Sequence, residues 1–196
     1  KDSSEENIDI RNQVITIIRN ECEKFGFRNI DTPALEYTEA LGKFLPDVDR
    51  PSGGVFSFQD EDDQWISMRY DLTAPLARYV AENYQFIPKP FKRYQVGSVW
   101  RNEKPGPGRY REFIQFDADV IGISNNYIDA EICVMVAKIF LELGFTTKEY
   151  KVKYSSRVIW ENLFKQIELD ETQIPAVLRA VDKLDRLGVD GVKELL

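Results

Sequence analysis

The sequence contains no histidine and only two cysteines among its 196 residues. Without histidine, acid–base catalysis by an imidazole of this chain is excluded. Cys22 and Cys133 stand at apolar positions of helix-like segments, which is typical of buried thiols in a reducing cytosol rather than of a disulfide scaffold. With no histidine and no clustered cysteines, we expect no protein-built metal site.

Long apolar runs are also lacking. No stretch approaches the roughly 18 apolar residues that a membrane span needs, and the opening KDSSEEN is too polar for a signal peptide. We therefore expect a cytoplasmic protein without membrane contact. The hydrophobic content of 43% is sufficient for a substantial core, so the chain should fold as one domain or as one domain and part of another.

Positive charge is scarce overall but concentrated in one place. The chain carries a net charge of −7, yet the segment 89–111 has seven Lys/Arg and a single acid, Glu103. General polyanion binding is disfavoured by the net charge, whereas a local anion site would account for the basic segment. The alternative is a cluster of solvated charges on a surface turn.

Helix and strand signals alternate along the chain. Ser3 and Glu6 have capping-box spacing, which predicts a helix that ends at Gly26. Asp71 or Thr73 can cap a later helix. Further expected elements are a short strand before Pro33, a hairpin over 55–70, a loop over 46–54, long strands over 91–103 and 109–121, a helix over 129–143, and two or three helices over 157–196. This order predicts an α+β fold with a largely antiparallel sheet flanked by helices.

Each long strand has one apolar and one polar face, because successive side chains of a strand point to opposite sides. The even positions are largely apolar, as at Tyr94 and Phe116. The odd positions combine arginines, carboxylates, two amides, a glycine, a valine and an aromatic ring: Gln95, Gly97, Val99, Arg101, Glu103, Arg109, Arg111, Phe113, Gln115, Asp117 and Asp119. An ordinary sheet with one face in water is one interpretation, and the wall of a ligand pocket is the other.

The polar residues suit a particular ligand. Arginine meets phosphate oxygens with a planar pair of donors, so Arg101 and Arg109 could bind a phosphate chain. Phe113 could stack on a base, and Asp71 and Asp119 could hold an ammonium group. No phosphate-binding loop of the Walker type and no dinucleotide fingerprint is present. The pattern thus favours a sheet face that binds a nucleotide together with an amine-bearing small molecule.

The chain resembles the catalytic domain of class II aminoacyl-tRNA synthetases, most closely the histidyl-tRNA synthetases of bacterial type. FGFRNIDTPALEYTEALGKF is similar to the family's first motif, SMRYDLTAPLARYVAEN to its amino-acid-binding segment, and FKRYQVGSVWRNEKPGPGRYREFIQFDADVIG to its second motif. VDKLDRLG also occurs in the inserted helical region of these enzymes. The likeness covers essentially the whole chain.

The resemblance implies a role for each matching residue. Arg101 would be catalytic, holding the α-phosphate of ATP and the substrate carboxylate, while Glu103, Arg109 and Phe113 would bind the rest of ATP. Histidine would be bound by Asp71, Leu72, Thr73, Arg101, Gln115, Asp119 and Tyr110. Lys104, Gly106 and Gly108 would belong to a loop that contacts tRNA. The implied activity is histidine–tRNA ligation with ATP and Mg²⁺, in a homodimer formed through the first-motif region, with histidine, ATP and tRNA(His) as partners.

Departures from the family pattern lead us to expect a truncated catalytic fragment. The resemblance implies a catalytic core over 1–153 and the start of the inserted helical region over 154–196, with the third motif and the anticodon-binding domain absent. Three alternatives remain: a paralogue that does not charge tRNA, such as the regulatory subunit of ATP phosphoribosyltransferase; a pseudo-synthetase domain for dimerisation or RNA sensing; and a class II synthetase for threonine, proline or glycine.

Overall fold

The computed structural model describes residues 3–44 and 54–195. It contains two compact units, Lys1–Val152 and Lys153–Leu196. The expected loop over 46–54 lies outside the described residues except for Gly54. None of the helices in the described ranges is long and apolar enough to cross a membrane.

The first helix, α1 (Glu5–Lys24), begins one residue later than the capping-box spacing predicted. Ser4, not Ser3, is the N-cap, and its hydroxyl oxygen accepts a hydrogen bond from the Asn7 backbone N–H. Two glutamates in the first turn complement the positive end of the helix dipole. The helix ends before Gly26, whose φ of +80° lies in the left-handed region that glycine adopts without strain.

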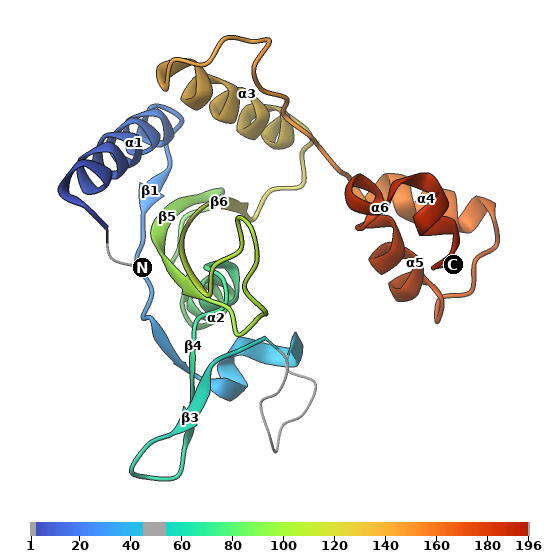
Figure 1. Cartoon of the computed structure of the whole chain (residues 1–196), viewed down its shortest axis with the longest axis horizontal. Coiled ribbons are helices and arrows are strands. Elements are labelled where there is room, and N and C mark those ends of the chain that lie inside the picture. The colour runs from blue at the N-terminus through green and yellow to red at the C-terminus, as the bar shows by residue number, and fades with distance from the viewer. Residues whose placement is uncertain (1–2, 45–53, 196) are drawn as a thin grey trace. The chain divides into compact units, whose positions relative to one another are not determined.

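Unit 1 contains two three-stranded sheets rather than one continuous sheet (Figure 1). The first has the order β1-β5-β6, in which β1 (Arg28–Asn29) runs parallel to β5 (Phe91–Trp100) and β6 (Glu112–Ile121) runs antiparallel to it. The second is antiparallel and consists of β2 (Leu35–Tyr37), β4 (Trp65–Met68) and β3 (Ser57–Gln59). The α+β fold with largely antiparallel strands is confirmed.

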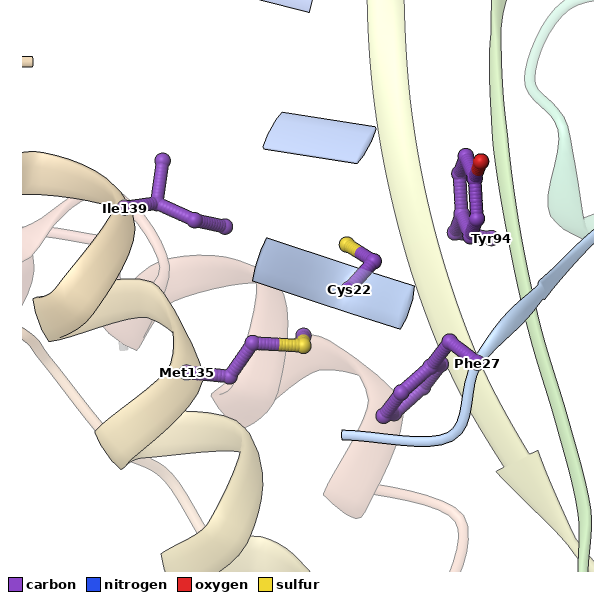
Figure 2. Packing of buried hydrophobic residues seen from close by; sticks show 5 residues of the cluster. All are labelled: Cys22, Phe27, Tyr94, Met135 and Ile139. Carbon is purple, nitrogen blue, oxygen red and sulfur yellow. The ribbon is translucent and has the colours of Figure 1, made fainter. Parts of the chain in front are cut away.

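The even positions of β5 and β6 face the hydrophobic core of unit 1. Tyr94 of β5 packs with Cys22 of α1, Phe27, and Met135 and Ile139 of α3 (Tyr127–Glu142), as Figure 2 shows. From β6, Phe116, Ala118 and Val120 pack against the same cluster. Burial raises the pKa of the Cys22 thiol to about 12, so this cysteine is an apolar core residue rather than a reactive thiol.

The odd positions of both strands share the other face, hereafter the polar face. The register pairs Arg93 with Asp119, Gln95 with Asp117, Gly97 with Gln115 and Val99 with Phe113. This face is not open to water as in an ordinary half-solvated sheet, since Arg93, Gln95 and Val99 are buried. Helix α2 (Thr73–Asn83) packs against it, with the Tyr79 ring stacked on Phe91.

Both long strands are shorter than their patterns predicted. β5 ends at Trp100 and β6 begins at Glu112, so Arg101, Glu103, Arg109 and Arg111 all lie in the connecting loop. The expected strand limits of 103 and 109 were wrong at this end. Pro105 and Pro107 lack a backbone N–H, and Gly108 has a φ of +69°, so this stretch cannot continue a regular ladder.

Unit 2 is helical, in agreement with the expectation for the C-terminal segment. It contains α4 (Arg157–Gln166), α5 (Ile174–Val181) and α6 (Leu184–Lys193). Its buried apolar residues are Phe164, Ala180 and Val192. Among the described residues of unit 1, the remaining regular element is the 3-10 helix η1 (Thr38–Phe44).

Gly97 provides a test of how the polar face is packed. A Cβ at this position would lie 2.4 Å from an Nη atom of Arg69, whose guanidinium is held by the carbonyls of Ser98 and Thr32. We expect Gly97→Ala to lower the free energy of unfolding by about 1–3 kcal/mol in urea denaturation, because the buried arginine must move. Gly106→Ala is the matched control, since a Cβ there meets nothing within 4 Å. Equal stabilities of the two variants would contradict this account.

Candidate active site

The loop from Arg101 to Arg111 is closed by backbone hydrogen bonds. The Arg101 N–H donates to the Arg111 carbonyl at 2.8 Å, and Gly106 and Arg109 exchange hydrogen bonds across a tight turn at the tip. The Nε of Arg111 donates to the Glu103 carbonyl at 3.3 Å. The Nη1 of Arg109 lies 3.9 Å from a carboxylate oxygen of Glu103. The turn at the loop tip, and not strand alternation, brings these two side chains together.

Arg101 is held between two aromatic rings. Its guanidinium carbon lies 4.5 Å from the centre of the Tyr70 ring and 5.0 Å from that of Phe113. The guanidinium also donates to the Tyr70 carbonyl and to Oε1 of Gln115, each at 3.4 Å. These contacts orient a permanent positive charge at the edge of the sheet, where it can bind an anion.

A cavity of 360 Å³ opens beside this arginine, which is within the size range of small-ligand sites. Its lining residues are Arg101, Glu103, Gly108, Arg109, Tyr110 and Phe113. The cavity thus combines two guanidinium groups, a carboxylate and two aromatic rings, which are the groups that a nucleotide requires.

Next to Arg101, the N-terminus of α2 meets β6. The N-cap position of α2 is Leu72, not Asp71 or Thr73 as expected, but one carboxylate oxygen of Asp71 accepts from the backbone N–H groups of Thr73 (3.1 Å) and Ala74 (2.9 Å). The Thr73 hydroxyl donates to Oδ2 of Asp117 at 3.1 Å, and Nε2 of Gln115 donates to Oδ1 of Asp117 at 2.8 Å. Three of the residues expected to bind histidine, Asp71, Thr73 and Gln115, are therefore neighbours.

Asp119 and Arg93 form a buried ion pair further along the polar face. Arg93 is fully buried, and its Nε lies 3.1 Å from Oδ2 of Asp119, whose side chain is 26% exposed. Another nitrogen of Arg93 donates to the carbonyl of Leu72, whose side chain is fully buried, so this expected histidine-binding residue offers a ligand no side-chain surface in this structure. Burial lowers the pKa of Arg93, and the surrounding carboxylates oppose that shift.

Three residues of this arrangement carry no role in the sequence-based assignment: Tyr70, Arg93 and Asp117. Tyr70 donates through its hydroxyl to Glu103 at 2.7 Å and supports Arg101. Asp117 was among the odd positions that strand alternation placed on the polar face. Arg93 was not, although it is an odd position of β5 and lies on the same face, opposite Asp119. Tyr70 had no comparable signal, because its partners lie on a loop beyond β5.

The loop tip stands apart from these contacts. Lys104 and Gly106 are exposed, whereas Gly108 and the largely exposed Tyr110 line the cavity. Tyr110 thus lies with the expected ATP-binding residues, although it was expected to bind histidine. Within residues 3–44 and 54–195, no three Asp, Glu, Cys or His side chains come together in a way that could hold a metal ion. Mg²⁺ is usually bound through one or two carboxylates together with substrate phosphates, so this finding does not bear on a magnesium ion that is carried by a nucleotide.

Comparison with known proteins decides the family. The family model described as histidyl-tRNA synthetase matches residues 1–195. The chain belongs to the histidyl-tRNA synthetase family. It is 54% identical over 187 residues to the histidine–tRNA ligase of Rhodopseudomonas palustris strain BisB18, an alignment that covers 93% of this chain and 36% of that protein. The chain thus spans little more than a third of the length of this relative.

Solved structures agree with the histidyl-tRNA synthetase fold. The crystal structure of histidyl-tRNA synthetase from Nostoc sp. PCC 7120 matches with a TM-score of 0.75 and 26% identity, covering 96% of this chain and 41% of that one. A Bacillus halodurans protein described as an ATP phosphoribosyltransferase regulatory subunit/histidyl-tRNA synthetase matches with a TM-score of 0.64 and 25% identity, covering 74% of this chain and 37% of that one.

The buried carboxyl of Asp119 makes the stability of the chain depend on pH. Burial raises the pKa of Asp119 above its ordinary value, Asp117 and Asp71 add to this, and Arg93 opposes it. The folded state therefore binds this proton more tightly than the unfolded state does. The contribution of protonated Asp119 to stability is complete below the ordinary aspartate pKa of about 3.9. It is lost as pH rises through the raised pKa that Asp119 has in the folded state.

We expect the stability of Asp119→Asn relative to wild type to rise with pH over that window and to level off above it. Urea unfolding at closely spaced pH values measures this difference. Asp9→Asn, at an exposed position of α1, is the control variant. A difference that stays constant or falls with rising pH would show that burial does not dominate at Asp119.

Proposed function

We propose that the longer protein to which this chain corresponds is a histidine–tRNA ligase, which activates histidine with ATP and transfers it to tRNA(His). The observation that carries the proposal is Arg101, fixed between the rings of Tyr70 and Phe113, in contact with Gln115 and at the wall of the cavity. One guanidinium at this place can reach both an anion in the cavity and a substrate beside Gln115.

ATP would occupy the cavity. Arg101 would bind the α-phosphate and Arg109 the γ-phosphate, while Glu103 would accept from the adenine amino group and Phe113 would stack on the base. All four residues line the cavity. Glu103 is already oriented by the hydroxyl of Tyr70, which leaves its second carboxylate oxygen 3.9 Å from Arg109. The polar wall thus offers complementary charge to both ends of a nucleotide.

Histidine would bind beside ATP, over the N-terminus of α2. Asp71, Thr73 and Gln115 would hold its ammonium group, with Leu72 between the first two along the chain. Asp119 and Tyr110 would line the imidazole pocket. The buried Arg93 balances part of the negative charge of the aspartates. The remaining negative charge would favour binding of a cationic substrate group, while Arg93 keeps the aspartates partly neutralised when no substrate is bound.

The reaction needs positioning more than proton transfer. A carboxylate oxygen of histidine attacks the α-phosphorus of ATP, the bond from that phosphorus to the bridging oxygen breaks, and pyrophosphate leaves with the bonding electrons. Arg101 would neutralise charge on the α-phosphate and keep the carboxylate in line. Arg109 would stabilise the departing pyrophosphate. No histidine or other general base of the chain is required for this step.

The remaining assignments follow from the family. Residues 1–153 would be the catalytic core and 154–196 the start of the inserted helical region. We also propose a cytoplasmic homodimer formed through the first-motif region, and a tRNA-contacting loop that includes Lys104, Gly106 and Gly108. The exposure of Lys104 and Gly106 supports contact between the loop tip and a macromolecule.

Binding of an adenylate analogue tests the proposed activity. We expect the chain to bind a sulfamoyl analogue of histidyl-adenylate at least about tenfold more tightly than the prolyl and threonyl analogues, measured by calorimetric titration. Arg101→Ala should weaken binding about a hundredfold, because it removes a preorganised charged donor. Arg101→Lys should recover little of the lost affinity for the analogue, since an ammonium lacks the planar pair of donors.

The control is Arg11→Ala in α1, an exposed arginine that should leave binding unchanged. Absence of binding to every analogue would favour the non-charging alternatives. Preference for the prolyl or threonyl analogue would overturn the histidine assignment.

The loop tip should act in the second half of the reaction. In a full-length histidyl-tRNA synthetase that carries this sequence, Lys104→Ala should raise the KM for tRNA(His) about three- to tenfold, because a contact to phosphate is lost. ATP–pyrophosphate exchange should stay within about twofold of wild type. Lys148→Ala, also at an exposed position, is the matched control. Equal losses in both assays would place Lys104 in activation instead.

A further inference from the structure

Asp117 is the least explained polar residue of the site. It lies on the polar face of β6, is half-buried, and uses both carboxylate oxygens within the site. Oδ1 accepts from Nε2 of Gln115 at 2.8 Å, and Oδ2 accepts from the Thr73 hydroxyl at 3.1 Å. The two partners come from different elements, Thr73 from the start of α2 and Gln115 from β6, and both belong to the proposed ammonium site.

The direction of these two hydrogen bonds matters for a cationic ligand. An ammonium group has three donors and no acceptor, so every protein group that binds it must present an acceptor. A hydroxyl and a side-chain amide can each present either a donor or an acceptor. Thr73 and Gln115 are therefore ambiguous by themselves, and half of their possible orientations would repel the ligand.

Asp117 removes this ambiguity. A carboxylate can only accept, so the Thr73 hydroxyl proton and the Gln115 amide nitrogen must both point toward it. The carbonyl oxygen Oε1 of Gln115 then faces the other way, and it does accept from Arg101 at 3.4 Å. The lone pairs of the Thr73 oxygen are likewise left for another donor. Both groups are thereby set as acceptors before any ligand arrives.

We infer that Asp117 is a positioning residue, which fixes the hydrogen-bond polarity of Thr73 and Gln115 so that both accept from the substrate ammonium. This inference rests on the proposed function, since that function defines the ligand. Each oxygen of Asp117 already accepts from one of these two partners, so the role assigned to Asp117 acts through Thr73 and Gln115. Its effect should therefore concern recognition of the amine and not of the rest of the adenylate.

The isosteric variant Asp117→Asn tests the role of polarity. An asparagine offers one acceptor and one donor, so it can accept from Thr73 only if its nitrogen faces Gln115. In that orientation Gln115 turns its oxygen toward the asparagine and its nitrogen toward the ammonium. In the opposite orientation the asparagine nitrogen donates to the Thr73 oxygen and uses an acceptor that the ammonium needs. The measured quantity is amine preference, the ratio of affinities for the histidyl sulfamoyl-adenosine analogue and for the same compound without the α-amino group.

We expect Asp117→Asn to reduce the amine preference at least about tenfold while affinity for the compound without the amine changes less than about threefold. Retained affinity for that compound shows that the variant folds and that its nucleotide site is intact. The matched control is Glu112→Gln, which removes a charge from an exposed side chain on the opposite face of the same strand. It should leave the preference unchanged.

An exchange variant separates polarity from mere loss of structure. This double variant combines Gln115→Glu with Asp117→Asn. The introduced asparagine accepts from Thr73 and donates to the introduced glutamate, which keeps a second oxygen for the ammonium. Amine preference should return to within about threefold of wild type. Measuring both variants at about 0.05 M and about 0.5 M salt identifies a long-range charge effect, because salt screens the interaction of distant charges but does not correct a misdirected donor.

The outcomes are distinct. If wild type binds neither compound, the proposed function fails and the inference fails with it. If wild type prefers the amine and Asp117→Asn keeps that preference, the inference alone is overturned. Failure of the exchange variant to recover, or a loss in Asp117→Asn that high salt abolishes, would also overturn it. A salt-independent loss followed by recovery in the exchange variant would support it.

Discussion

The antiparallel ladder between β5 and β6 is the constraint on which the rest of this structure depends. Ten residue pairs, from Phe91–Ile121 to Trp100–Glu112, set which side chains face the core and which face the site. A shift of one residue in this register would turn Tyr94 and Phe116 out of the core and move the whole polar set into it. The pairing of β5 with β6 therefore fixes both faces of this part of the sheet. One face packs in the core with α1 and α3, and the other forms the site next to α2.

The polar face shows how a binding surface can be kept inside a fold. Arg69 and Arg93 are buried, and each donates to backbone carbonyls: Arg69 to those of Ser98 and Thr32, and Arg93 to that of Leu72. The Nε of Arg93 makes no hydrogen bond within the described residues and faces the carboxylate of Asp119 instead. Burial disfavours the charged forms of both Arg93 and Asp119, as their opposite pKa shifts indicate. Such groups contribute little net stability, but they hold neighbouring charges in fixed positions.

Preorganisation extends from these buried groups to the edge of the sheet. Tyr70 supports Arg101 through its ring and orients Glu103 through its hydroxyl, while Asp117 joins Gln115 to the start of α2. Most of the groups proposed to contact substrate are thus held by a neighbour that is not proposed to contact it. In a site that works by charge and orientation, such supporting contacts reduce the reorganisation needed when the ligand binds.

Much of this arrangement could be predicted from the sequence alone, because it depends on local rules. Alternation along a strand placed Gln95, Gly97, Phe113, Gln115, Asp117 and Asp119 on one face, and the capping signal placed Asp71 at the start of α2. The motif pattern around Arg101 indicated the family.

Tertiary structure decided the contacts that local rules cannot predict. It placed Arg109 and Arg111 in a loop instead of a strand, covered the polar face with α2, and brought Tyr70 to Glu103 and Thr73 to Asp117. Those contacts join elements distant in sequence, and their geometry follows from how helix and sheet pack, which no local spacing records.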